Sequence, residues 1–333
     1  MKRFLSVTLL ILLLLTILLI ISCGGKKAGL QKRAVLPDKT LFANGMEFLR
    51  KHQFIKARLA FQTLINTYED SEYLEKAKYY IAYSFLEEGG IENLVQAEQA
   101  FKDFKLFFPT SDLADDAQAH IVAINMRMMK APNRDLTYTN KAYTEIKNFL
   151  EEFPDSPLVE EMKLRLHYVE DILATSSYLK GKFYYKKKFY KASASRFREC
   201  VTRFKTFGLR DSALYMLADS LEHLKNTDES AIYYAQLVRG YPFSQYFKTA
   251  KERLQKLEKP IPPVDKKLAE ENQKYYTQEG SMLLAPFRMI FSIFSFGGQD
   301  KPWEALEKKR EKQEKELIKS YAKKENKKKK RKA

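Results

Sequence analysis

The sequence predicts an all-α fold, a right-handed solenoid of about five helix pairs followed by a helical C-terminal extension. The 333 residues include 23 Phe and 20 Tyr but only 12 Gly, which is typical of helices packed by aromatic side chains with few tight turns. A spacing of small, aromatic and proline residues also recurs five times along the chain. A third observation, an apolar leader that ends in a cysteine, indicates where the protein works.

The leader is typical of a secretory signal, because two basic residues precede an apolar run at 4–21 and Cys23 follows where cleavage is expected. This order resembles a lipobox. We therefore expect residues 1–22 to be a lipoprotein signal peptide and Cys23 to carry lipid, including palmitate, that holds the mature protein on a membrane. An uncleaved transmembrane anchor is the competing interpretation, but it does not explain the cysteine. Gly24, where some lipoproteins have an inner-membrane retention Asp, favours the outer membrane.

A tether at residues 23–38 leads to the repeat region, residues 39–259. In each unit a small residue on the first helix is followed by a small residue on the second helix, by an aromatic residue or Ile four positions later, and by a position for proline eight further on. In chain order the units read Gly45, Ala57, Phe61, Glu69; Ala82, Ala97, Phe101, Pro109; Ala119, Ala142, Ile146, Pro154; Gly181, Ser193, Phe197, Lys205; and Ala218, Ser230, Tyr234, Pro242. Insertions separate the two helices of unit two, at Gly89 and Gly90, and of unit three, around Pro132.

Each position of this spacing has a physical role. Small residues let two antiparallel helices approach closely, the aromatic residue fills the gap against the next unit, and proline ends the second helix. A serine two residues after the proline position, such as Ser111 or Ser156, is well placed to cap the following helix. Five units in one register are identified as tetratricopeptide-like repeats, whereas an ordinary helical bundle would match the spacing only by chance.

A lipobox followed by five such repeats resembles the BamD family, also called the ComL or YfiO family, of outer-membrane protein assembly lipoproteins. Residues 134–139 and 151–157 are similar to the family's third repeat and its preceding loop, and residues 181–187 are similar to its fourth repeat. The resemblance covers about residues 41–257. Units one and four depart from it because they lack the proline, and nothing after Lys259 matches.

The resemblance implies a scaffold of the β-barrel outer-membrane protein assembly (BAM) complex. Such a scaffold is lipid-anchored in the outer membrane, faces the periplasm and supports protein insertion into the membrane through protein–protein interaction. Its N-terminal repeats are associated with nascent outer-membrane proteins, and its C-terminal repeats with the periplasmic domains of the β-barrel insertase.

The first helices of a stacked array line its concave face, where an aromatic groove could hold a partner peptide. In units one and two we expect this groove to be lined by Phe42, Met46, Leu49, Tyr79, Tyr83 and Leu86. The alternative is that several of these side chains are simply buried against the neighbouring repeat.

No catalytic pattern emerges. The four histidines are scattered, and no Cys/His cluster has the spacing of a zinc site. We therefore expect no enzymatic activity, no metal and no cofactor apart from the covalent lipid on Cys23. Cys200 lies in an aromatic helical stretch, where we expect a buried and unreactive thiol.

The C-terminal extension, residues 260–333, begins with a proline cluster that ends the array, and a helix containing Lys266 and Glu270 is expected next. For the apolar segment 282–296 three interpretations remain open: a cap on the solenoid, a partner-binding segment, or a segment at a membrane surface. The basic tail 327–332 either contacts anionic headgroups and lipopolysaccharide phosphates or is simply solvated.

Two other functions compete with the assembly role. A repeat lipoprotein could organise another envelope machine, such as peptidoglycan synthesis or export. The basic tail and the competence-related family name also suggest a DNA-uptake lipoprotein. Because the repeats show no basic stripe with interleaved aromatic residues, no nucleic-acid partner is expected.

Overall fold

The computed structural model describes residues 36–276 together with Lys312 and Glu316. The leader, Cys23, the apolar segment 282–296 and the basic tail 327–332 lie outside the described residues. The described part of the chain forms twelve helices and no strand, so the predicted all-α class is confirmed. Within that part, no helix combines the length and the apolar character needed to cross a bilayer.

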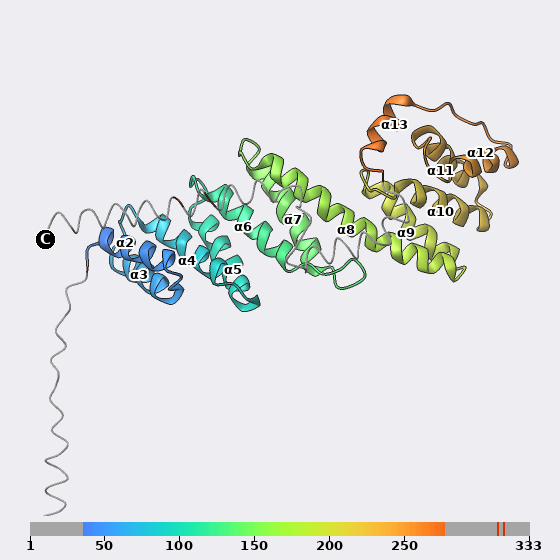
Figure 1. The fold of residues 1–333 in the computed structure, drawn as a ribbon. Coiled ribbons are helices and arrows are strands. Elements are labelled where there is room, and N and C mark those ends of the chain that lie inside the picture. Colours follow the sequence, from blue (N-terminus) through green and yellow to red (C-terminus); the bar gives the residue numbers. More distant parts are fainter. Residues whose placement is uncertain (1–35, 277–311, 313–315, 317–333) are drawn as a thin grey trace, which may run out of the picture.

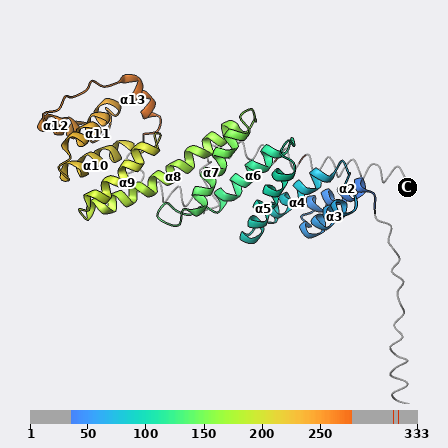
Figure 2. The same ribbon diagram turned by 180° about the vertical axis from the view of Figure 1, so that it is seen from behind.

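The helices form a row of antiparallel pairs, and from α2 to α12 each helix packs on its neighbours in sequence (Figure 1). The first helices of the five units are α2 (Asp38–Arg50), α4 (Leu74–Glu88), α6 (Ala114–Arg127), α8 (Val159–Lys186) and α10 (Arg210–His223). The second helices are α3 (Phe54–Thr67), α5 (Ile91–Phe107), α7 (Thr137–Glu152), α9 (Tyr190–Arg203) and α11 (Thr227–Gly240). Seen from behind, the same order runs in the opposite direction (Figure 2). The predicted solenoid of five helix pairs is therefore the observed fold.

The small residues of the repeat lie where the two helices of a unit touch. A Cβ atom added to Gly45 would lie 2.7 Å from Cδ1 of Phe61, and one added to Gly181 would lie 3.0 Å from the Phe197 ring. The Phe61 ring also stacks on Tyr80 of the next unit, with centroids 6.2 Å apart. The aromatic residue thus fills the space both within its own unit and toward the next.

Units four and five use serine where the first three units use alanine, and the hydroxyl forms a hydrogen bond. Ser193 Oγ donates to the carbonyl of Gly181 at 3.2 Å, and Ser230 Oγ donates to the carbonyl of Ala218 at 2.7 Å. In both units the acceptor is the small residue twelve positions earlier. The two small positions of the repeat are therefore in direct contact.

All five second helices end ten residues after their small residue, whether or not proline follows. The next residue is always aromatic, and the C-cap positions are Tyr68, Phe108, Phe153, Phe204 and Tyr241. Phe108 and Phe153 contact the rings of Phe104 and Phe149, one turn back. Units one and four, which lack proline, also end at an aromatic C-cap.

Unit four begins with a single long helix. The first helix of this unit, α8, runs unbroken for 28 residues. Gly181 lies within this helix. A glycine is needed there because the Phe197 ring occupies the space that a side chain would take. The N-terminal half of α8 packs against α7 and its C-terminal half against α9, so one helix joins units three and four.

The array ends in half a unit. α12 (Phe247–Lys256) packs on α11, and Glu258 then adopts a positive φ of 54°, as His52, Lys188 and Lys225 do after α2, α8 and α10. The predicted proline break follows, and α13 (Lys266–Gln273) turns back onto α11. Its N-cap Asp265 accepts from the Leu268 amide at 3.1 Å.

Candidate partner-binding surface

The six residues predicted to line a groove are buried. Their side chains are 0–5% exposed: Phe42, Met46, Leu49, Tyr79, Tyr83 and Leu86. The Phe42 ring, for example, contacts the rings of Phe61, Tyr73 and Tyr80 at centroid distances of 4.9–6.2 Å. The structure therefore places these side chains in the packed interior of the N-terminal units and does not present them to a partner.

The contacts of Tyr79 and Tyr83 explain this placement. The Tyr79 hydroxyl lies 3.1 Å from Nε2 of His120 in the next unit, and the His120 ring stacks on Phe101 with centroids 4.9 Å apart. Tyr83 also contacts His120. The polar tip of a buried tyrosine needs such a partner, so His120 serves the packing of unit two against unit three.

Neighbouring units are also joined by a serine and an acidic residue. A serine in the loop before each of four first helices donates to a carboxylate in the first turn of the preceding first helix, and the pairs are Ser71–Asp38, Ser111–Glu75, Ser156–Asp115 and Ser244–Asp211. The same hydroxyls accept the backbone N–H two residues later. We call these pairs the serine–acid links.

The serine–acid links correct the expectation that these serines are helix caps. Each helix begins three residues after its serine, and none of the four has a side-chain cap hydrogen bond. Charged acceptors strengthen a hydrogen bond, so the serine joins two units instead of completing one helix.

Unit four lacks this link because Phe207 stands where the serine would be. Its place is taken by Thr206, whose Oγ1 lies 3.1 Å from Nδ1 of His167. Nε2 of His167 lies 3.7 Å from Oδ2 of Asp171. Burial raises the pKa of Asp171 to about 7, although the backbone N–H of Gly208 donates to its carboxyl. Burial also lowers the pKa of His167.

An ion pair is enclosed where units three and four meet. Nη2 of Arg165 lies 2.7 Å from Oε1 of Glu161, both side chains are 2% exposed, and Nη1 of Arg165 lies 3.5 Å from Sδ of Met126 in α6. Enclosed charges are tolerated in a fold only when they are paired and hydrogen-bonded. Arg165 is therefore paired within α8 and also contacts α6 through Met126.

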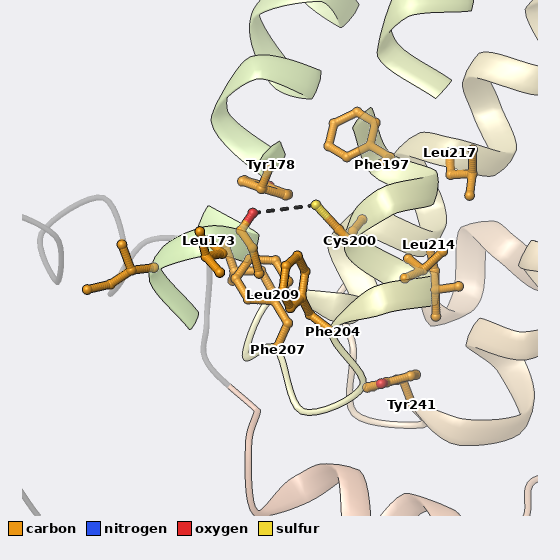
Figure 3. Close-up of a cluster of buried hydrophobic side chains, with 14 of the residues drawn as sticks. Leu173, Tyr178, Phe197, Cys200, Phe204, Phe207, Leu209, Leu214, Leu217 and Tyr241 are labelled. Atoms are coloured by element: carbon orange, nitrogen blue, oxygen red, sulfur yellow. Dashed lines mark hydrogen bonds between the residues drawn. The ribbon is translucent and has the colours of Figure 1, made fainter. Parts of the chain in front are cut away.

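The described residues hold no group of three or more His, Cys, Asp or Glu side chains that could bind a metal ion. Cys200 is fully buried among Tyr178, Phe197 and Phe204, and its Sγ lies 3.5 Å from the carbonyl of Ala174 (Figure 3). Burial raises the pKa of its thiol. The prediction of a buried thiol in the core is confirmed.

Exposed aliphatic side chains lie instead on the outer helices of the N-terminal units. Ile55 and Leu59 on α3 and Ile91 and Val95 on α5 are 48–74% exposed. Ile55 and Val95 occupy the same register, two residues before Ala57 and Ala97. That shared register is visible in the sequence, but the binding face was expected on the first helices alone.

Comparison with known proteins gives the family. The family described as YfiO, outer membrane lipoprotein, matches residues 35–233. Outer membrane protein assembly factor BamD of Rickettsia prowazekii (strain Madrid E) is 27% identical over 217 residues, which cover 65% of this chain and 85% of that protein.

Among solved structures, the TPR2AB domain of yeast Sti1 in its complex with pHSP90 aligns with 78% of this chain and 98% of its own. The identity is 15% and the TM-score is 0.33. The family match, by contrast, spans more than half of the sequence and all of the first four units. The chain therefore belongs to the YfiO family of outer membrane lipoproteins.

Proposed function

We propose that this protein is a scaffold of the β-barrel outer-membrane protein assembly complex, anchored in the outer membrane by lipid on Cys23 and facing the periplasm. It binds the periplasmic domains of the insertase and unfolded β-barrel substrates. The observation that carries the proposal is the family match over residues 35–233. The relative named as an outer membrane protein assembly factor supports it.

The packing of the array suits a scaffold. The serine–acid links, the Tyr79–His120 contact and the contact of Arg165 with Met126 each join one unit to the next. Because the units are held in fixed order, surfaces at the two ends of the array stay at a fixed separation. Two partners can then be held at the same time.

The exposed aliphatic side chains of α3 and α5, which are Ile55, Leu59, Ile91 and Val95, are assigned to the substrate-binding face in this proposal. Strands of an outer-membrane barrel carry an apolar side chain at every second position. An unfolded strand therefore offers apolar anchors that an exposed aliphatic surface can cover. The six buried residues, Phe42, Met46, Leu49, Tyr79, Tyr83 and Leu86, support this face from the interior.

Cross-linking and mass spectrometry on membranes that carry the tagged full chain test the proposal. We expect recovery of a large β-barrel protein with periplasmic domains, and a weaker yield from the Cys23→Ala variant. Recovery of cell-wall synthesis or export proteins instead would assign the scaffold to another envelope machine. Equal yields from the two chains would contradict the lipid anchor alone.

A photo-reactive amino acid at Val95 sharpens the test of the substrate face. We expect it to capture unfolded outer-membrane proteins, whereas the same probe at Phe243, an exposed apolar position at the far end of the array, should not. Capture at Phe243 with none at Val95 would place the substrate elsewhere.

A further inference from the structure

The turn between α8 and α9 concentrates positive charge. From residue 172 to residue 198 the chain has no Asp or Glu and eight basic residues: Lys180, Lys182, Lys186, Lys187, Lys188, Lys191, Arg196 and Arg198. The expectation that the repeats carry no basic stripe with interleaved aromatic residues is wrong for this segment. The turn lies at an outer corner of the array, where the ribbon passes from green to yellow (Figure 1).

Three consecutive lysines of this turn, Lys186, Lys187 and Lys188, are not neutralised by the described part of the fold. Arg196 and Arg198 pair with Glu199 and Glu229. By contrast, no ion pair joins Lys186, Lys187 or Lys188 to another described residue, and all three are exposed.

The acidic groups of unit five do not pair with these three lysines. Asp219 is buried and accepts from the Tyr185 hydroxyl, and Glu222 pairs with Arg253 at 3.0 Å. The charge of the turn is therefore available to an anionic partner.

The aromatic residues of the turn divide into two sets. Tyr185 and Tyr190 face unit five, where the Tyr190 ring stacks on His223 with centroids 4.1 Å apart. Phe183 and Phe189 remain 57% and 62% exposed. These two phenyl rings have no polar atom, so covering them would remove apolar surface from water and lower the free energy.

The turn itself is ordered by the backbone. The amides of Lys187, Lys188 and Phe189 donate to the carbonyls of Phe183, Tyr185 and Tyr184, at 2.9–3.2 Å. Lys188 takes a positive φ of 60°. This short turn presents Phe189 and its neighbouring lysines on a fixed support, so little conformational entropy is lost when a partner covers them.

We propose that the α8–α9 turn docks on an anionic lipid surface, with Phe183 and Phe189 at the acyl boundary and Lys186, Lys187 and Lys188 on headgroup phosphates. Phenyl rings flanked by lysines whose long stems reach outward fit the boundary between headgroups and acyl chains. A flat anionic protein or a nucleic acid would satisfy the lysines equally well. The chain belongs to a family of outer membrane lipoproteins, which favours lipid among these partners.

The test places an environment-sensitive fluorescent amino acid at Phe189 in the full chain, reconstituted into vesicles. One set of vesicles is phosphatidylcholine, and in the other about a third of the lipid is phosphatidylglycerol. We expect a blue-shifted emission, quenched by nitroxide-labelled headgroups, only on the anionic vesicles. The same probe at Phe243, which is as exposed but lies outside the basic turn, should not change.

The matched variant Lys186→Gln, Lys187→Gln, Lys188→Gln keeps the length of the side chains and removes their charge. Each basic residue near an anionic surface changes binding about fivefold, so the loss of three should lower the equilibrium constant for contact by about a hundredfold. An unchanged far-ultraviolet circular dichroism spectrum and unfolding midpoint show that the variant is folded, since the three side chains are exposed.

Three outcomes would overturn the proposal. Equal shifts on both kinds of vesicle would remove the role of the lysines, and no shift on either would remove the lipid contact. A shift caused by single-stranded DNA or by an acidic protein, with none on vesicles, would assign the turn to that partner. None of these results depends on which proteins the cross-linking experiment recovers.

Discussion

Units one to three and units four and five build the same helix pair with different atoms. In the first three units the second helix presents alanine at its small position, and neighbouring units are joined by serine–acid links. In the last two units that position is serine bonded to a carbonyl, and unit four replaces the serine–acid link with the Thr206–His167 contact. The repeat therefore constrains the size of the small residue and the distance between helices more tightly than it constrains side-chain chemistry.

The largest predicted effect lies where the two regions meet. Arg165→Met leaves the enclosed carboxylate of Glu161 without its guanidinium, so the free energy of unfolding should fall by about 3–5 kcal/mol. Urea unfolding followed by circular dichroism measures this change. The double variant Glu161→Leu, Arg165→Met should recover most of the loss, whereas Lys163→Met, which breaks the exposed pair with Glu160, should change stability by less than about 1 kcal/mol.

A second comparison sets unit one against unit four through their glycines. Gly45→Ala brings a methyl group into the Phe61 ring and should cost about 2–3 kcal/mol. Gly181→Ala meets the Phe197 ring at a larger distance and should cost about 1 kcal/mol. Thermal unfolding of the two variants gives the order. Equal costs would show that unit one relaxes around the new methyl group as easily as unit four does.

A third comparison concerns pH, because only unit four carries the His167–Asp171 cluster. With its pKa raised to about 7, Asp171 holds its proton in the folded chain to a higher pH than in the unfolded chain, where a carboxyl has a pKa of about 3.9. Its contribution therefore makes the free energy of unfolding fall as pH rises from about 4 to about 7.

The side chain of the Asp171→Asn variant cannot lose a proton. The free energy of unfolding of this variant should therefore exceed that of the wild type by about 1–2 kcal/mol at pH 7.5 and equal it at pH 4. The gain stays modest because 29% of the Asp171 side chain is exposed. Burial lowers the pKa of His167. In both proteins this makes the free energy of unfolding rise with pH below about 6.5. Urea titrations across this range measure the difference, and parallel curves for the two proteins would contradict it.

The smallest expected effect compares the links themselves. Ser156→Ala removes a hydrogen bond of 2.6 Å to the Asp115 carboxylate and should cost about 1–2 kcal/mol. Thr206→Ala in unit four removes a bond between neutral groups and should cost about 1 kcal/mol or less. Chemical denaturation distinguishes the two, and a larger loss at Thr206 would make the histidine contact the stronger junction.

The sequence was sufficient for the architecture, because spacing alone locates the contacts between helices. The small and aromatic positions predicted all five pairs and both insertions. The sequence did not show whether Phe42 and Tyr79 are buried or belong to a binding face. A first helix that packs on its own partner and on the next unit is apolar on more than one side. The role of Ser156 was also hidden, because its acceptor Asp115 lies 41 residues earlier.

The half unit at the C-terminal end has a consequence for how many copies of the chain can join. A stack of similar units exposes an end helix that can pack on another copy of the chain. A head-to-tail contact of this kind that does not close into a ring produces filaments. Here α13 folds back over α11, where Nδ2 of Asn272 donates to the carbonyl of Gly240 at 3.0 Å and Arg239 pairs with Asp265 at 3.2 Å. The chain thereby uses its own continuation to cover this helix, which opposes polymerisation of the solenoid through that end.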